Sequence, residues 1–121
     1  MKMLLSIKPE FAKEIITGKK KFEFRKFRCR DEVQRILLYS TRPQKQVIAE
    51  ADLEHIIEGT VAQVWEETKD FAGIDREYYD LYYHGKDKAY AYQLANVRVF
   101  DRPMSLSELG VSCAPQSHCY I

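Results

Sequence analysis

Lys20, Glu23 and Arg25 place two bases and an acid within the stretch GKKKFEFRK, which runs from Gly18 to Lys26. Residues two apart on a β-strand share a face, so Glu23 and Arg25 would be neighbours, with Lys20 reaching over the same edge from the preceding turn. Such a cluster can hold a phosphate or an amide group. The pattern also fits a solvated edge strand whose lysines prevent aggregation, and spacing alone leaves both interpretations open.

Acid–base catalysis by Lys20 and Glu23 would require a pKa displaced far from its usual value by burial or by a neighbouring charge. An ion pair that holds the shape of a site needs no such shift, so a structural or ligand-orienting role is simpler. A carboxylate can also accept hydrogen bonds from the amino and imino edge of cytosine or guanine. Arg25 would then bind a phosphate or stack on a base.

The elements that must position these residues follow from the apolar pattern. Met3–Ile7 predicts a short strand, and the next segment predicts a helix that begins at Pro9 and is ended by Gly18. Lys21–Arg25 alternates apolar and polar side chains, which predicts a half-buried strand with Glu23 on its polar face.

The rest of the chain predicts several strands around a helical insertion. Strands are expected at Arg35–Ser40, Val47–Leu53 and Lys88–Asn96, the last continuing through Val97–Phe100 until Pro103 stops it. Capping residues Thr60, Asp75 and Ser105 open helices that end near Phe71, Gly85 and Gly110. Consecutive strands joined by short turns favour an α+β fold of mixed or antiparallel strands, a small curled sheet or barrel with helices at its ends. Residues 1–121 are expected to form a single domain.

Charge is unevenly distributed along the chain. The 19 Lys and Arg against 18 Asp and Glu give a net charge of +1, yet Lys19–Arg30 alone holds seven bases and one acid. No apolar run reaches the roughly 20 residues that span a bilayer, and the N-terminus turns polar too soon for a secretory signal. Three cysteines, an odd number, suit reduced thiols. A cytoplasmic protein with no membrane segment is therefore expected.

Cys113, His118 and Cys119 are of the residue types that bind zinc, but they contain no C-x-x-C, and the adjacent His118 and Cys119 would rarely bind one ion without strain. A tetrahedral site would also need Cys29 or His84 as a fourth ligand. No metal, no other cofactor and no catalytic Cys–His pair is predicted.

Polar and aromatic residues elsewhere are further candidates. Ser40 and Arg42 fit a turn before Pro43 first and a phosphate-contacting loop second. Gln116 and Ser117 offer an amide and a hydroxyl for a base edge, or for closing a barrel end. Six tyrosines could stack on unpaired bases, although helical spacing favours core and rim positions for most of them: Tyr78, Tyr79, Tyr82, Tyr83, Tyr90 and Tyr92.

Gly18, Lys20, Glu23 and Arg25 match G-x-K-x-x-E-x-R, the motif that marks the ASCH domain, and the sequence resembles stand-alone ASCH proteins over nearly its whole length. The turn YSTRP, the strand AYAYQL and the closing APQSHCY belong to the same resemblance. It implies a PUA-like β-barrel with the motif in a cleft, and family members are inferred to bind RNA. One branch of this fold hydrolyses the amide of acetylated cytidine and another cleaves single-stranded RNA. The amidohydrolase's threonine corresponds to Glu23 here, so that activity is not transferred.

The sequence therefore predicts a module that binds RNA or a nucleotide-like ligand in a basic cleft. Phosphates would meet Lys20, Lys21, Arg25 and Lys26, while Glu23, Gln116 and Ser117 would read a base. The alternative is a small hydrolase acting on a modified nucleoside, or a ribonuclease, with Lys20 as the catalytic residue beside Glu23. A third possibility is a protein-interaction domain whose basic strand meets an acidic partner.

Overall fold

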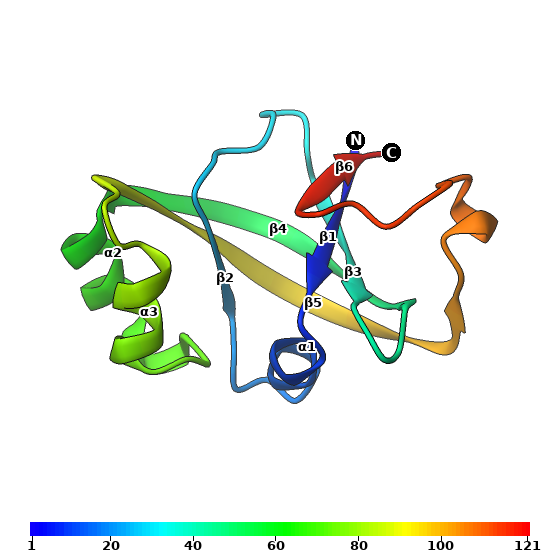
Figure 1. The fold of residues 1–121 in the computed structure, drawn as a ribbon, viewed down its shortest axis with the longest axis horizontal. Coiled ribbons are helices and arrows are strands. Elements are labelled where there is room, and N and C mark those ends of the chain that lie inside the picture. The colour runs from blue at the N-terminus through cyan, green and yellow to red at the C-terminus, as the bar shows by residue number, and fades with distance from the viewer.

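A six-stranded mixed sheet carries the fold of residues 1–121 in the computed structural model (Figure 1). Its strands lie in the order β2-β5-β4-β3-β1-β6. The parallel pair is β1–β3, and every other neighbouring pair is antiparallel. The bounds are β1 (Lys2–Ile7), β2 (Phe22–Arg25), β3 (Arg35–Ser40), β4 (Gln46–Thr60), β5 (Lys88–Met104) and β6 (His118–Tyr120). The predicted α+β class with a curled, mixed sheet is confirmed.

The helices begin where the capping residues predict. Helix α1 (Pro9–Ile16) has proline in its first turn, and its buried Ala12 and Ile15 pack against the main core. Helix α2 (Val61–Thr68) opens with the reciprocal capping box of Thr60 and Gln63, and continues as the 3₁₀ helix η1 (Lys69–Phe71). Asp75 caps α3 (Arg76–Tyr82). Figure 1 shows α2 and α3 together at the far end of the long β4–β5 hairpin.

Two strands are longer than the sequence pattern indicates. β4 and β5 pair from Thr60 opposite Lys88 to Val47 opposite Met104, so Pro103 lies inside β5 and does not end it. Beyond Leu53, β4 is half-buried or exposed, which removes the apolar alternation from this strand although its pairing with β5 continues. The one-turn helix η2 (Ser107–Leu109) follows and ends at Gly110, as expected.

Side chains join the two edges of the sheet, where no backbone ladder pairs β2 with β6. Arg25 on β2 donates to the carbonyl of Ser6 on β1 at 2.8 Å and to the hydroxyl of Ser117, just before β6, at 3.2 Å. Beyond Arg25, the ring of Phe27 stacks on His118 with centroids 4.0 Å apart. The curled sheet is therefore closed into a barrel-like shape by side-chain contacts across this seam.

The helical insertion between β4 and β5 sits on the turn before β2. Gly73 has φ of +68°, and a Cβ atom there would lie 2.4 Å from the Cβ of Lys20. The backbone amide of Lys21 donates to the carbonyl of Phe71 at 2.9 Å, which also holds the helical insertion close to the turn before β2. Only glycine meets both the backbone and the packing requirement at this contact.

We expect Gly73→Ala to destabilise the protein more than Gly85→Ala. Both glycines have positive φ, but a Cβ at Gly85 would have nothing within 4 Å. The left-handed backbone alone costs about 1–2 kcal/mol, and the overlap with Lys20 adds about 1–3 kcal/mol. Urea denaturation measures both changes. Equal losses for the two variants would show that Lys20 is not packed against Gly73.

Candidate functional site

A cavity of about 160 Å³ lies where the start of α1, strand β2 and helix α3 meet. Lys20, Glu23 and Arg25 form its charged wall, and aromatic rings from α1, β2 and α3 form much of the rest. The lining residues are Ser6, Ile7, Lys8, Phe11, Lys20, Glu23, Phe24, Arg25, Ile74, Tyr78 and Tyr82. Segments far apart in the sequence thus build one small chamber around the motif.

The polar wall of this cavity is almost completely removed from solvent. Lys20 is 2% exposed, Glu23 is 6% exposed and Arg25 is 8% exposed. β2 is an edge strand, as one interpretation held, but a solvated edge would leave these side chains in water. Because burying unpaired charge is costly, their burial requires specific partners.

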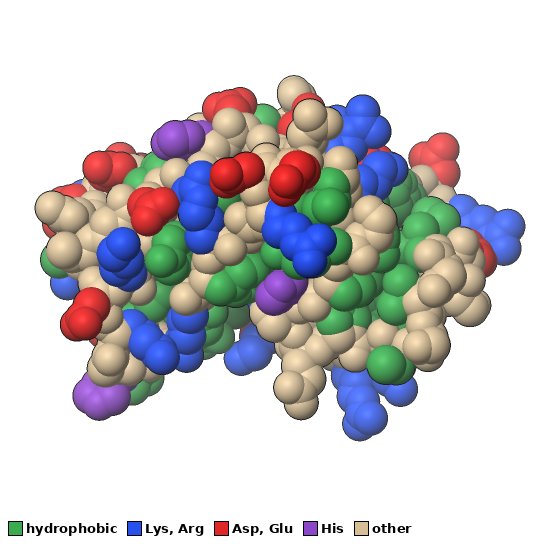
Figure 2. All heavy atoms as spheres, turned by 90° about the horizontal axis from the view of Figure 1, so that it is seen from above, with side chains coloured by type: hydrophobic (Ala, Val, Ile, Leu, Met, Phe, Trp, Pro, Cys, Tyr) green, Lys and Arg blue, Asp and Glu red, His purple; other side chains and the backbone are tan.

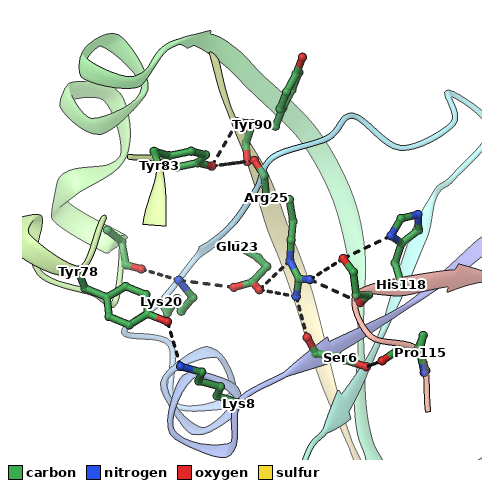
Figure 3. A network of polar contacts seen from close by, with 12 residues as sticks. Ser6, Lys8, Lys20, Glu23, Arg25, Tyr78, Tyr83, Tyr90, Pro115 and His118 are labelled. Carbon is green, nitrogen blue, oxygen red and sulfur yellow. Dashed lines mark hydrogen bonds and ion pairs between the residues drawn. The ribbon is translucent and has the colours of Figure 1, made fainter. Parts of the chain in front are cut away.

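Arg25 is held by contacts that use all its donors (Figure 3). Its Nε and Nη2 both donate to Oε2 of Glu23, at 3.1 and 2.8 Å. Nη2 also donates to Ser6, and Nη1 points to the carbonyl and hydroxyl of Ser117 at 3.4 and 3.2 Å. A guanidinium has five N–H groups, so none is left for a phosphate. In this structure Arg25 positions Glu23, and a phosphate contact of Arg25 stays a prediction that would require one of these donors to be released.

Lys20 is fixed by the helical insertion. Its Nζ donates to the carbonyl of Ala72 at 2.8 Å and lies 4.8 Å from the ring centroid of Phe24. The carboxylate of Glu23 is 3.7 Å away. Burial lowers the pKa of the Lys20 ammonium, and the neighbouring charge of Glu23 opposes that shift. The pairing of Lys20 with Glu23 was expected, but the Ala72 contact has no signal in the sequence.

Glu23 keeps one oxygen without a hydrogen bond. Oε2 takes both donors of Arg25, whereas Oε1 has only the ammonium of Lys20, at 3.7 Å, beyond hydrogen-bond distance. The side chain is 8% exposed and lines the cavity. A buried carboxylate held in a fixed orientation thus offers a free acceptor to whatever enters.

The rim of the cavity joins two residues that the sequence did not single out, Lys8 and Phe11, to two of the tyrosines expected to be able to stack on bases. Lys8 donates its Nζ to the hydroxyl of Tyr78 at 3.2 Å, joining the start of α1 to α3. The ring of Tyr78 packs edge-on against Phe11, with centroids 5.2 Å apart. Tyr82 follows one helical turn later, and burial raises the pKa of its phenol. The i and i+4 spacing of Tyr78 and Tyr82 was the only signal that could have found this pair.

The other predicted site residues are dispersed. Ser117 does not line the cavity but accepts a hydrogen bond from Arg25, which does. The ammonium of Lys26 lies over the ring of Tyr82, 4.5 Å from its centroid. Lys21 is exposed and lies over Phe71 instead. Gln116 is exposed. Ser40 and Arg42 do not line the cavity either: the hydroxyl of Ser40 is buried without a hydrogen-bond partner, and Arg42 lines a separate cavity of about 400 Å³.

The positive charge of Lys19–Arg30 is divided between several surroundings. Lys20 and Arg25 are buried beside Glu23, and Arg28 pairs with Glu58 at 2.9 Å. Figure 2 shows acidic and basic side chains interspersed on the face that carries the chain termini. That face is therefore not a uniform basic surface.

Side chains of the metal-binding types do not cluster. No group of three or more His, Cys, Asp or Glu residues is close enough to hold a metal ion, and all three cysteines are free. Separately, none of the helices has the length and apolar character needed to cross a membrane.

Comparison with known proteins points to one family. The ASCH domain profile matches residues 5–104. The "ASCH domain-containing ribonuclease" of Zymomonas mobilis is 38% identical over 107 residues, which cover 88% of this chain and 72% of that protein. A crystal structure of ASCH from Zymomonas mobilis has a TM-score of 0.89 and 35% identity, covering 99% of this chain and 87% of that chain.

A second relative shares only part of its length. The large ribosomal subunit protein uL22 of Ureaplasma parvum is 34% identical over 91 residues, or 75% of this chain. Those residues make up 29% of that protein, so the chain spans less than a third of this relative. The likeness concerns one segment of a longer protein.

We expect Arg25→Met to destabilise the protein by about 3–5 kcal/mol, because the carboxylate of Glu23 would stay buried without its partner. The triple variant Lys20→Met with Glu23→Leu and Arg25→Met should lose less than the single variant, since no buried charge remains at the site. Urea denaturation of both variants tests this. A triple variant no more stable than Arg25→Met would contradict the described role of these charges.

Proposed function

This chain belongs to the ASCH domain family, and from that premise we propose that it binds single-stranded RNA or a nucleotide-like ligand, with one base in the cavity between α1, β2 and α3. The described relative from Zymomonas mobilis is named a ribonuclease, which makes RNA the favoured polymer for this chain. The cleft is the one built around Lys20, Glu23 and Arg25.

The free oxygen of Glu23 carries the proposal. Oε1 lacks a donor inside the protein, and Arg25 holds the carboxylate so that it cannot turn away. The amino group of cytosine or the amino and imino groups of guanine would donate to it. The rings of Phe11 and Tyr82 supply apolar contact for the base. A base in a duplex would have to leave its partner to present this edge.

Phosphates would lie outside the cavity, at its rim. Lys8 and Lys26 are exposed there and form none of the ion pairs seen elsewhere in the protein. Lys21 would serve a more distant phosphate, and Gln116, beside Ser117, would contact the base edge. Contacts of this kind make affinity fall with salt, with a log–log slope of about −0.7 per phosphate on a single strand.

RNA cleavage is the second candidate, because the relative from Zymomonas mobilis is named a ribonuclease. The amine of Lys20 lines the cavity, and its pKa is lowered by burial, so a larger fraction is uncharged than for an exposed lysine. In that case Lys20 would exchange a proton with the substrate while Glu23 orients it. The hydrogen bond to Ala72 argues instead for a fixed, structural lysine.

We expect Glu23→Gln to weaken binding of a fluorescein-labelled oligocytidine by roughly 10- to 100-fold, because a hydrogen bond to a charged acceptor is lost. The salt slope should stay the same, since Glu23 meets no phosphate. Glu67→Gln, at an exposed carboxylate on α2 without an ion pair, is the matched control. Fluorescence anisotropy measures both. Equal affinities for the two variants would refute the role of Glu23.

If the chain cleaves RNA, Lys20→Met should abolish turnover while RNA still binds. Gel analysis of the labelled strand after incubation tests this, with circular dichroism as the check on folding. Cleavage that persists in Lys20→Met would exclude Lys20 as the catalytic residue. Intact RNA with the wild-type protein would leave binding as the function.

A further inference from the structure

Three exposed lysines without an ion pair rest on aromatic rings of the helical insertion. Each ammonium lies within reach of a cation–π contact. The nitrogen-to-centroid distances are 4.5 Å for Lys26 over Tyr82, 5.4 Å for Lys8 over Tyr78 and 4.3 Å for Lys21 over Phe71. In each pair the lysine comes from residues 8–26 and the ring from residues 71–82.

Tyr82 differs from Phe71 in lining the cavity that contains Glu23. Its ring packs edge-on against Tyr83, with centroids 4.8 Å apart and planes at 74°. Tyr83 is itself anchored, because its hydroxyl donates to the carbonyl of Arg25 at 2.8 Å. Tyr82 is therefore a fixed surface beside the cavity, with a hydroxyl that makes no hydrogen bond inside the protein.

Lys26 covers this surface with a contact that is easily replaced. An exposed cation–π contact shifts an equilibrium by roughly two- to fivefold, whereas stacking of a base on an aromatic ring is worth roughly five- to a hundredfold. An ammonium released from the ring also gains a phosphate as its partner. Lys26 directly follows Arg25, is exposed and lies over Tyr82, so a nucleotide that leaves the cavity on the Tyr82 side would meet its ammonium.

We propose that Tyr82 is a stacking subsite for the nucleotide next to the one in the cavity, and that Lys26 moves from the ring to the phosphate joining the two nucleotides. This subsite rests on the proposed binding of single-stranded RNA. Lys21 and Phe71 form the same kind of pair but do not line the cavity, so an RNA dinucleotide, too short to bring a second phosphate to Lys21, leaves their contact in place.

The direct test is a proton NMR titration of the wild-type protein with the cytidine RNA dinucleotide, whose single phosphate is the one assigned to Lys26. The ring current of Tyr82 shifts the side-chain protons of Lys26 upfield in the free protein, and Tyr82→Leu, which removes that shift, identifies their signals. Saturation with RNA should abolish the shift of Lys26 and preserve that of Lys21. RNA that saturates the protein while Lys26 keeps its shift overturns the subsite but not the proposed function.

The RNA affinities of variants give a second test of the subsite. Tyr82→Leu should weaken binding of oligocytidine by roughly five- to a hundredfold. It should leave binding of an abasic ribose-phosphate chain unchanged. Its loss of affinity for oligocytidine should be larger than that of Phe71→Leu. Equal effects of Tyr82→Leu and Phe71→Leu would overturn the subsite. Failure of the wild-type protein to bind oligocytidine at all would refute the proposed function and the subsite with it.

Discussion

The contact of Arg25 with Glu23 is the interaction on which the rest of the structure depends. One guanidinium joins edge strand β2 to β1 and to the segment before β6, closing the curled sheet where no backbone pairing does so. The guanidinium of Arg25 donates twice to Oε2 of Glu23, which leaves Oε1 of Glu23 without a hydrogen bond. Since the carbonyl of Arg25 also anchors Tyr83, the helical insertion is fixed by the same residue. Fold closure and site geometry therefore have one cause.

This arrangement places different polar groups inside the cavity and at its rim. An acceptor lies inside, on Glu23, and cations without carboxylate partners lie at the rim, on Lys8 and Lys26. A nucleotide has the complementary arrangement, with hydrogen-bond donors on its base and negative charge on its phosphate. Lys20 completes the inner wall, and its contact with Ala72 and the glycine at position 73 keep it in place. The buried charges thus serve orientation more than stability.

Local patterns predicted the parts of this protein that depend on neighbours in sequence. Pro9, Thr60 and Asp75 begin helices as their chemistry requires, and the two-residue spacing of Glu23 and Arg25 places them in contact. Local patterns could not predict contacts between segments far apart in the sequence. For example, Lys8 donates a hydrogen bond to the hydroxyl of Tyr78, which lies 70 residues later in the chain. The length of β4 was likewise underestimated, because beyond Leu53 this strand lacks a continuous apolar face.

The most direct test of the central claim is a titration with labelled single-stranded RNA, double-stranded RNA and single-stranded DNA at two salt concentrations, with the length of each strand checked afterwards. A cavity that receives one base predicts salt-sensitive binding of single-stranded RNA and much weaker binding of the duplex, whose base edges are paired. Duplex RNA bound as tightly as the single strand, or binding indifferent to salt, would contradict it.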